Sequence, residues 1–184
     1  MKLALSTLVL FFGVSSSASV GQVAIKGGSW SFQTENVRSN SESSSGFGAY
    51  SVEIAYAVSP KFQGVFGINV LMSDIYTGSS GYGFDFGGKY FPFTSAGTID
   101  IESGKASIII QEKWRPYIGL SFRQRIFNLA LSSSYLGPGM SLGVDYSLSR
   151  DVFLNAEFRY DYLYGNGDAL AKQMNMLIGL GIEF

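Results

Sequence analysis

The most constraining feature of this chain is an alternation of apolar and polar residues with a period of two. In seven segments the even-numbered positions are apolar or aromatic, and the exceptions are Gly64, Gly88 and Pro116. The odd-numbered positions are mostly Gly, Ser, Asn, Gln or charged. Since successive side chains of a strand point to opposite faces, each segment is predicted to be a β-strand with one apolar face. The segments are residues 50–58, 62–72, 82–90, 116–122, 140–148, 152–162 and 174–184.

An eighth strand is predicted over residues 22–34, because a single-chain barrel of antiparallel strands closes with an even number of them. The alternation breaks here at Gly27 and Gly28, which leaves Ile25 and Trp30 on opposite parities. A β-bulge at the two glycines would restore one apolar face to this strand.

The connections alternate between short and long, which is typical of barrels with tight turns at one end and loops at the other. Residues 59–61 and 149–151 are predicted to be tight turns. Longer polar loops are predicted over residues 36–45, 73–80, 124–136 and 163–170.

Residues 92–113 break this pattern, because a long connection stands where a short turn is expected. They contain two apolar runs, 98–101 and 106–110, which favour a small extra hairpin or two strand extensions. Two further barrel strands, ten in all, are the alternative. Eight strands are favoured because each run is shorter than the 9–11 residues of a spanning strand.

The N-terminus has the pattern of an export signal. Lys2 precedes an apolar run over residues 3–14, and Ser16, Ser17 and Ala18 supply the small residues of a cleavage site. The run is too short to span a bilayer as a helix. The predicted domains are therefore a signal peptide over residues 1–18 and a β-barrel over residues 19–184.

Glycines on the polar face distinguish a membrane barrel from a soluble one. A soluble barrel of the lipocalin kind has the same period but turns its apolar face inward. Glycine is unfavourable on a water-facing strand surface, whereas the interior of a narrow eight-stranded barrel needs small side chains. The polar face carries Gly67, Gly83, Gly87, Gly119, Gly143, Gly179 and Gly181.

The same face carries acidic and basic residues in near balance, which suits mutual pairing inside a closed bore. They form a predicted ion-pair network in the lumen: Glu53, Asp85, Lys89, Arg123, Arg125, Asp145, Glu157, Arg159 and Asp161. The predicted fold is thus all-β, an eight-stranded antiparallel up-and-down transmembrane β-barrel.

Aromatic residues gather toward the strand ends, where amphipathic rings would lie at the level of lipid headgroups. They form a predicted aromatic girdle: Tyr50, Tyr56, Tyr82, Tyr90, Trp114, Tyr146, Tyr160 and Tyr162.

The last strand alternates up to a terminal aromatic residue, with Met176, Ile178, Leu180, Ile182 and Phe184 on one face. In this strand, and in residues 115–120 and 137–162, the chain resembles small outer-membrane barrels of the OmpA, OmpX and OmpW kind. The resemblance implies an integral protein of the Gram-negative outer membrane whose last strand is the signal read by the barrel-assembly machinery. It also implies contact with outer-membrane lipid and lipopolysaccharide. The long connection over residues 92–113 departs from the family pattern.

The composition excludes several function classes. The chain has no Cys and no His and a formal net charge of −1, so thiolate chemistry, His-dependent catalysis and a basic nucleic-acid surface are not expected. Glu157 and Asp161 lie roughly 13 Å apart along one strand, too far to share a proton directly. No enzyme activity, metal or cofactor is therefore expected.

Three functions fit these observations. The first is a structural or surface-interaction barrel with a lumen filled by ion pairs. The second is a narrow channel for small or hydrophobic solutes, as in OmpW-like proteins. The third is a secreted soluble barrel that binds a ligand. The sequence leaves the oligomeric state open.

Overall fold

The computed structural model describes residues 21–36, 39–72, 80–94, 98–100, 107–109, 112–128, 133–165 and 169–184. The predicted signal peptide, residues 1–18, lies outside these ranges. Within them, no helix has the length and apolar character needed to cross a membrane.

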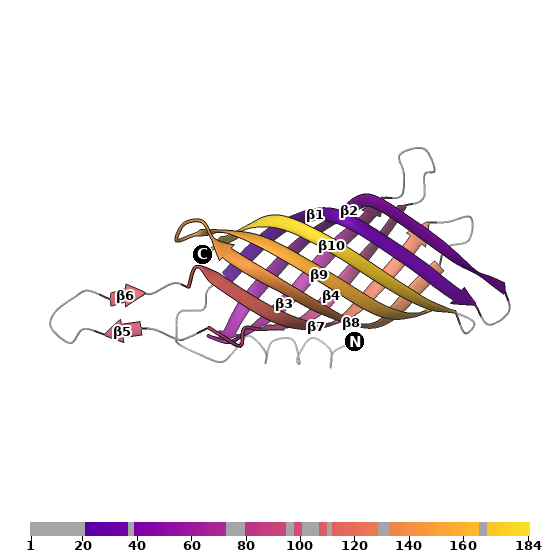
Figure 1. Ribbon diagram of the computed structural model, residues 1–184. Helices are drawn as coiled ribbons and strands as arrows, with labels where there is room; N and C mark the ends of the chain where they lie inside the picture. Colours follow the sequence, from indigo (N-terminus) through magenta and orange to yellow (C-terminus); the bar gives the residue numbers. More distant parts are fainter. Residues whose placement is uncertain are drawn as a thin grey trace, which may run out of the picture.

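Eight antiparallel strands close into one barrel in the order β1-β10-β9-β8-β7-β4-β3-β2, and β1 pairs with β2 and with β10 (Figure 1). The predicted eight-stranded up-and-down barrel is therefore confirmed. The strands are β1 Gly21–Asn36, β2 Ser39–Ser59, β3 Phe62–Met72, β4 Ser80–Tyr90, β7 Trp114–Asn128, β8 Ser133–Ser147, β9 Val152–Gly165 and β10 Leu170–Glu183.

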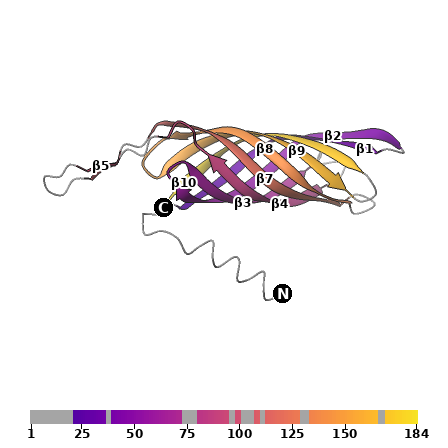
Figure 2. The same ribbon diagram turned by 90° about the horizontal axis from the view of Figure 1, so that it is seen from below.

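The two remaining strands are short and pair only with each other. β5 Thr98–Asp100 and β6 Ser107–Ile109 form a separate two-stranded sheet. Both views place this hairpin beyond the end of the barrel at which the chain terminates (Figures 1 and 2). The extra hairpin, rather than two additional barrel strands, is thus the correct interpretation of residues 92–113.

The barrel has two distinct ends. We call the turn end the one that holds the β2–β3 and β8–β9 connections, the start of β1 and the end of β10. The opposite end is the loop end. The predicted tight turns at residues 59–61 and 149–151 both lie at the turn end, between strands that pair directly.

Strands at the loop end are longer than predicted, so parts of three predicted loops are wrong. Residues 39–45 belong to β2 and pair with β1, residues 124–128 belong to β7, and residues 133–136 and 163–165 extend β8 and β9. The apolar–polar contrast that marks strands fades here, because the inward side chains Phe127, Tyr135 and Leu163 are themselves apolar. Backbone pairing continues although the pattern has ended.

The predicted phase of the first strand is also wrong. The β1–β2 register does shift near the glycines, from Gly28↔Ala49 to Trp30↔Gly46, but the extra residue lies on β2. The alternation of β1 therefore continues unbroken: Ile25 is 65% exposed, whereas Trp30 is 5% exposed. Trp30 faces the interior, where its indole N–H donates to the carbonyl oxygen of Met72 at 2.9 Å.

Candidate functional site: the barrel lumen

The nine charged residues of the predicted lumen network all lie inside the barrel, and none is more than 6% exposed. They occupy odd-numbered positions, which point inward on β2, β4, β7, β8 and β9, while the even-numbered neighbours point outward. The strand period alone therefore brings residues far apart in sequence into one bore.

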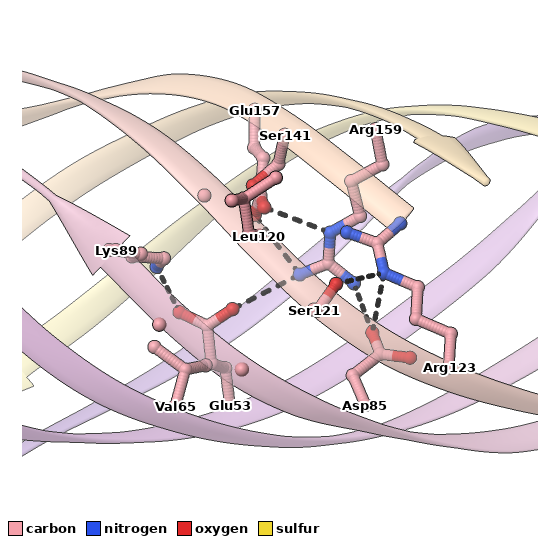
Figure 3. Close-up of a pocket in the computed structure, with 13 residues that line it drawn as sticks. Glu53, Val65, Asp85, Lys89, Leu120, Ser121, Arg123, Ser141, Glu157 and Arg159 are labelled. Carbon is pink, nitrogen blue, oxygen red and sulfur yellow. Dashed lines mark hydrogen bonds and ion pairs between the residues drawn. The ribbon is translucent and has the colours of Figure 1, made fainter. Parts of the chain in front are cut away.

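Glu53 is the centre of the first cluster. Its carboxylate pairs with Arg159 Nη2 at 3.1 Å and with Lys89 (Figure 3). It also pairs with Lys26 Nζ at 2.9 Å. Glu157 binds the same Lys26 at 2.5 Å and the same Arg159 at 3.0 Å. Two carboxylates from β2 and β9 are thereby joined through shared cations across the lumen.

Asp85 is the centre of a second cluster nearer the loop end. It accepts hydrogen bonds from Arg125 Nη1 at 2.6 Å and from Arg159 Nη1 at 3.0 Å, and Arg123 Nε lies 3.9 Å away. Asp161 pairs with Arg123 and lies 3.5 Å from Arg125 Nη2. Arg159 belongs to both clusters and connects them (Figure 3).

A third group lies at the turn end. Glu183 of β10 pairs with Arg115 of β7 and accepts a hydrogen bond from Gln22 of β1. Asp145 lies 3.7 Å from the same arginine and accepts from Asn155 at 2.7 Å. This group ties the β1–β10 seam to the opposite wall of the barrel.

Lys26, Arg115 and Glu183 are lumen residues that the sequence analysis missed. Arg115 and Glu183 have the inward parity of their strands, so the period of two could have identified them. Lys26 could not be assigned, because it lies in the strand whose phase was misjudged.

Charge balance explains how the lumen tolerates so many buried ionic groups. The fully buried set holds five cations (Lys26, Lys89, Arg123, Arg125 and Arg159) and five anions (Glu53, Asp85, Asp145, Glu157 and Asp161). A buried charge without a partner costs several kcal/mol, whereas a paired and hydrogen-bonded one is tolerated. The formal charges of these ten buried side chains therefore cancel.

Glycines on the inner face provide the space for the long cations. A Cβ added at Gly139 would lie 2.8 Å from Arg123 Nε, and one at Gly83 would lie 2.8 Å from Arg125 Nη1. At Gly179 the same atom would meet the side chain of Lys26 at 2.7 Å. These close approaches explain why the polar face combines glycine with arginine and lysine.

The inward side chains of the charged region are buried. A cavity of about 20 Å³ lies between the charged clusters, lined by Gly87, Gly119, Ser121, Ser141 and the surrounding ionic groups (Figure 3). A cavity of this size holds about one water molecule. Among the described residues, no group of three or more carboxylates is arranged to hold a metal ion.

Comparisons with solved structures find the same fold. No protein-family model matches the sequence, and no curated protein matches it. Neisserial surface protein A is similar, with a TM-score of 0.60 and 15% identity over 91% of this chain and 100% of that chain. The N-terminal β-barrel domain of OprF from Pseudomonas aeruginosa gives 0.55 and 14% over 89% and 97%. The outer membrane protein OprG from the same bacterium gives 0.53 and 14% over 89% and 96%.

The outer surface of the barrel is covered with exposed apolar side chains. Large apolar side chains, such as Phe66, Leu142 and Ile178, project outward from every strand of the barrel and are 42%, 54% and 69% exposed. A closed barrel satisfies its backbone hydrogen bonds internally and can therefore face hydrocarbon. The chain has the fold of small outer-membrane β-barrels. The predicted resemblance to barrels of this kind is confirmed for the fold, and the outward apolar face excludes a soluble barrel with an enclosed apolar face.

The predicted girdle residues lie near both ends of the barrel. At the turn end, the ring of Trp114 lies 4.5 Å from that of Tyr146, and Tyr90 lies 4.8 Å from Phe62. Tyr56 is exposed at the same end. Tyr50, Tyr82, Tyr160 and Tyr162 lie on the outward-facing parity toward the loop end, the first two of them exposed.

The last strand, β10, and the residue after it carry the five residues of the predicted assembly signal on the outer face of the barrel. Met176, Ile178, Leu180, Ile182 and Phe184 are all exposed. Phe184 exchanges backbone hydrogen bonds with Gly21 at 2.8 and 2.9 Å, so the terminal aromatic residue lies at the β1–β10 seam.

Proposed function

We propose that this protein is a closed, non-enzymatic outer-membrane barrel that serves membrane structure or surface contact and does not conduct ions. The observation that carries the proposal is the filled lumen. Ion pairs join strands that are not neighbours, Lys26 on β1 with Glu157 on β9 and Arg159 on β9 with Glu53 on β2. Among the described residues, ion pairs of this kind would stiffen the barrel and close its lumen to a continuous aqueous path.

Its partners follow from its two surfaces. Outer-membrane lipid and lipopolysaccharide would cover the apolar band and its aromatic girdle. The barrel-assembly machinery would engage the alternating last strand during insertion. The loop end would make any contact outside the cell.

A narrow channel is the second candidate. It is favoured by the polar middle of the lumen, where the 20 Å³ cavity is lined by Glu53, Lys89 and Arg123 together with glycines. Rearrangement of these ion pairs would open a hydrated path.

Planar-bilayer recording of the refolded full chain separates the two functions. We expect a flat current trace for protein that shifts in gel mobility on boiling, which shows that the barrel was folded. Regular conductance steps from such protein would instead establish the channel and overturn the proposal.

A further inference from the structure

The lumen has a second, apolar region at the loop end that the ion-pair network does not include. We define the loop-side layer as Trp30, Phe32, Leu71, Phe127, Tyr135 and Leu163, which are all at most 9% exposed. They come from β1, β3, β7, β8 and β9 and lie close to the loop end of each strand. The layer therefore lies between the charged clusters and the outside.

The aromatic rings of this layer contact one another across the bore. The Phe32 ring lies 4.4 Å from Phe127 and 5.2 Å from Tyr135 between centroids, and Phe127 lies 6.2 Å from Tyr135. Trp30 lies 6.4 Å from Phe127, and its indole N–H is held by the carbonyl of Met72. Rings at these separations are in favourable packing contact.

The remaining strands complete the layer with small residues. β2 supplies Ala49 and β10 supplies Ala171, both buried in the same cluster. β4 supplies Gly81, where an added Cβ would lie 2.7 Å from the Phe127 ring. All eight strands of the barrel thus contribute to the layer, and none of these residues is charged.

We propose that the loop-side layer is a separate seal that blocks ions and water from outside, independently of the ion-pair network. An apolar constriction excludes ions because they would have to shed their hydration shell to pass. The charged region can be hydrated when a pair breaks, whereas the layer carries no charge, and its polar side-chain atoms are limited to the Tyr135 hydroxyl and the indole N–H of Trp30, which is bonded to Met72. The inference rests on the proposed closed barrel and adds the position of its outer seal.

Ser51 is a suitable reporter of this seal. It lies on β2 between Ala49 of the layer and Glu53 of the network, and it is 2% exposed. Its hydroxyl has no hydrogen-bond partner among the described atoms, so Ser51→Cys removes no observed contact. The chain contains no Cys, so the introduced thiol is the only one that can react.

The experiment measures the reaction of a small cationic methanethiosulfonate with Ser51→Cys in the folded barrel. We expect slow labelling in the otherwise unchanged chain and in Glu53→Gln. We expect the rate to rise on the order of tenfold or more with Phe32→Ser/Phe127→Ser, which makes the layer polar and open. Phe32→Leu/Phe127→Leu is the matched control, because it shortens the rings but keeps the layer apolar, and its labelling stays slow.

Three results would overturn the inference. The first is rapid labelling of Ser51→Cys without any change in the layer. The second is a Glu53→Gln variant that accelerates labelling as much as the serine pair does. The third is slow labelling with the serine pair in protein whose gel mobility still shifts on boiling. If the serine pair does not fold, Phe127→Ser alone is measured against Phe127→Leu under the same criteria. Bilayer conductance of the unchanged chain is recorded alongside, so that failure of the closed-barrel proposal is recognised separately.

Discussion

Replacement of Glu53 by Ala is expected to lower the free energy of unfolding by about 3–5 kcal/mol, the cost of removing one partner from a buried ionic group. Glu53 accepts from Lys26, Lys89 and Arg159, and all three cations are buried. Without the carboxylate, Lys89 loses the one ion pair that it forms with a described residue. The measurement is urea unfolding of the protein in lipid vesicles. The folded fraction is determined from the difference in gel mobility between folded and unfolded protein.

Two variants control this prediction. Glu53→Gln keeps the side-chain volume and a hydrogen-bond acceptor. It is therefore expected to lower the free energy of unfolding by less than Glu53→Ala does. Ser51→Ala, two residues away on the same inner face, removes a hydroxyl without a partner and is expected to change the stability by less than about 1 kcal/mol. A Glu53→Ala barrel as stable as the Ser51→Ala barrel would show that the network contributes little.

Introduction of a charge on the outer face is expected to have the second-largest effect. Leu142 is 54% exposed in the middle of the apolar band of β8, between Ile118 and Phe158 on its neighbours. Leu142→Arg is expected to destabilise the barrel in vesicles by about 2–4 kcal/mol, the cost of an arginine at the bilayer midplane.

Leu148→Arg is the control for depth. Leu148 is 52% exposed but lies beyond the turn end of β8, so the same charge is expected to cost only about 0–1 kcal/mol there. Equal losses at the two positions in the same unfolding assay would mean that Leu142 does not face hydrocarbon.

Most of the fold follows from one property of the sequence, the contrast between the two faces of each strand. Lipid outside and a polar bore inside impose opposite demands on neighbouring residues, so seven strands could be predicted with the correct face. The inward parity also brought the nine charged residues to one side of the sheet. Their partners could not be predicted, because cross-lumen pairs such as Arg123–Asp161 depend on where distant strands stand in the closed barrel.

The contrast between apolar and polar positions is lost where the lumen changes from polar to apolar along a strand. On β1 the inward residues Trp30 and Phe32 are apolar, whereas the outward Ser29 and Ser31 are polar, so the pattern reverses halfway along the strand. A sequence pattern cannot distinguish this reversal from a bulge. For the same reason the loop-side layer was not predicted: an apolar residue at an inward position, such as Leu71, broke the alternation and did not indicate a seal.

Tryptophan quenching by lipids with brominated acyl chains tests the arrangement most directly, because the chain has only two Trp residues. Trp114→Phe leaves Trp30, which lies in the lumen; Leu142→Trp with both native tryptophans replaced by Phe places one indole on the outer face. Strong quenching of the indole at position 142 and weak quenching of Trp30 is the expected result. If Trp30 were quenched as strongly as the indole at position 142, or more strongly, the assignment of inside and outside would be wrong.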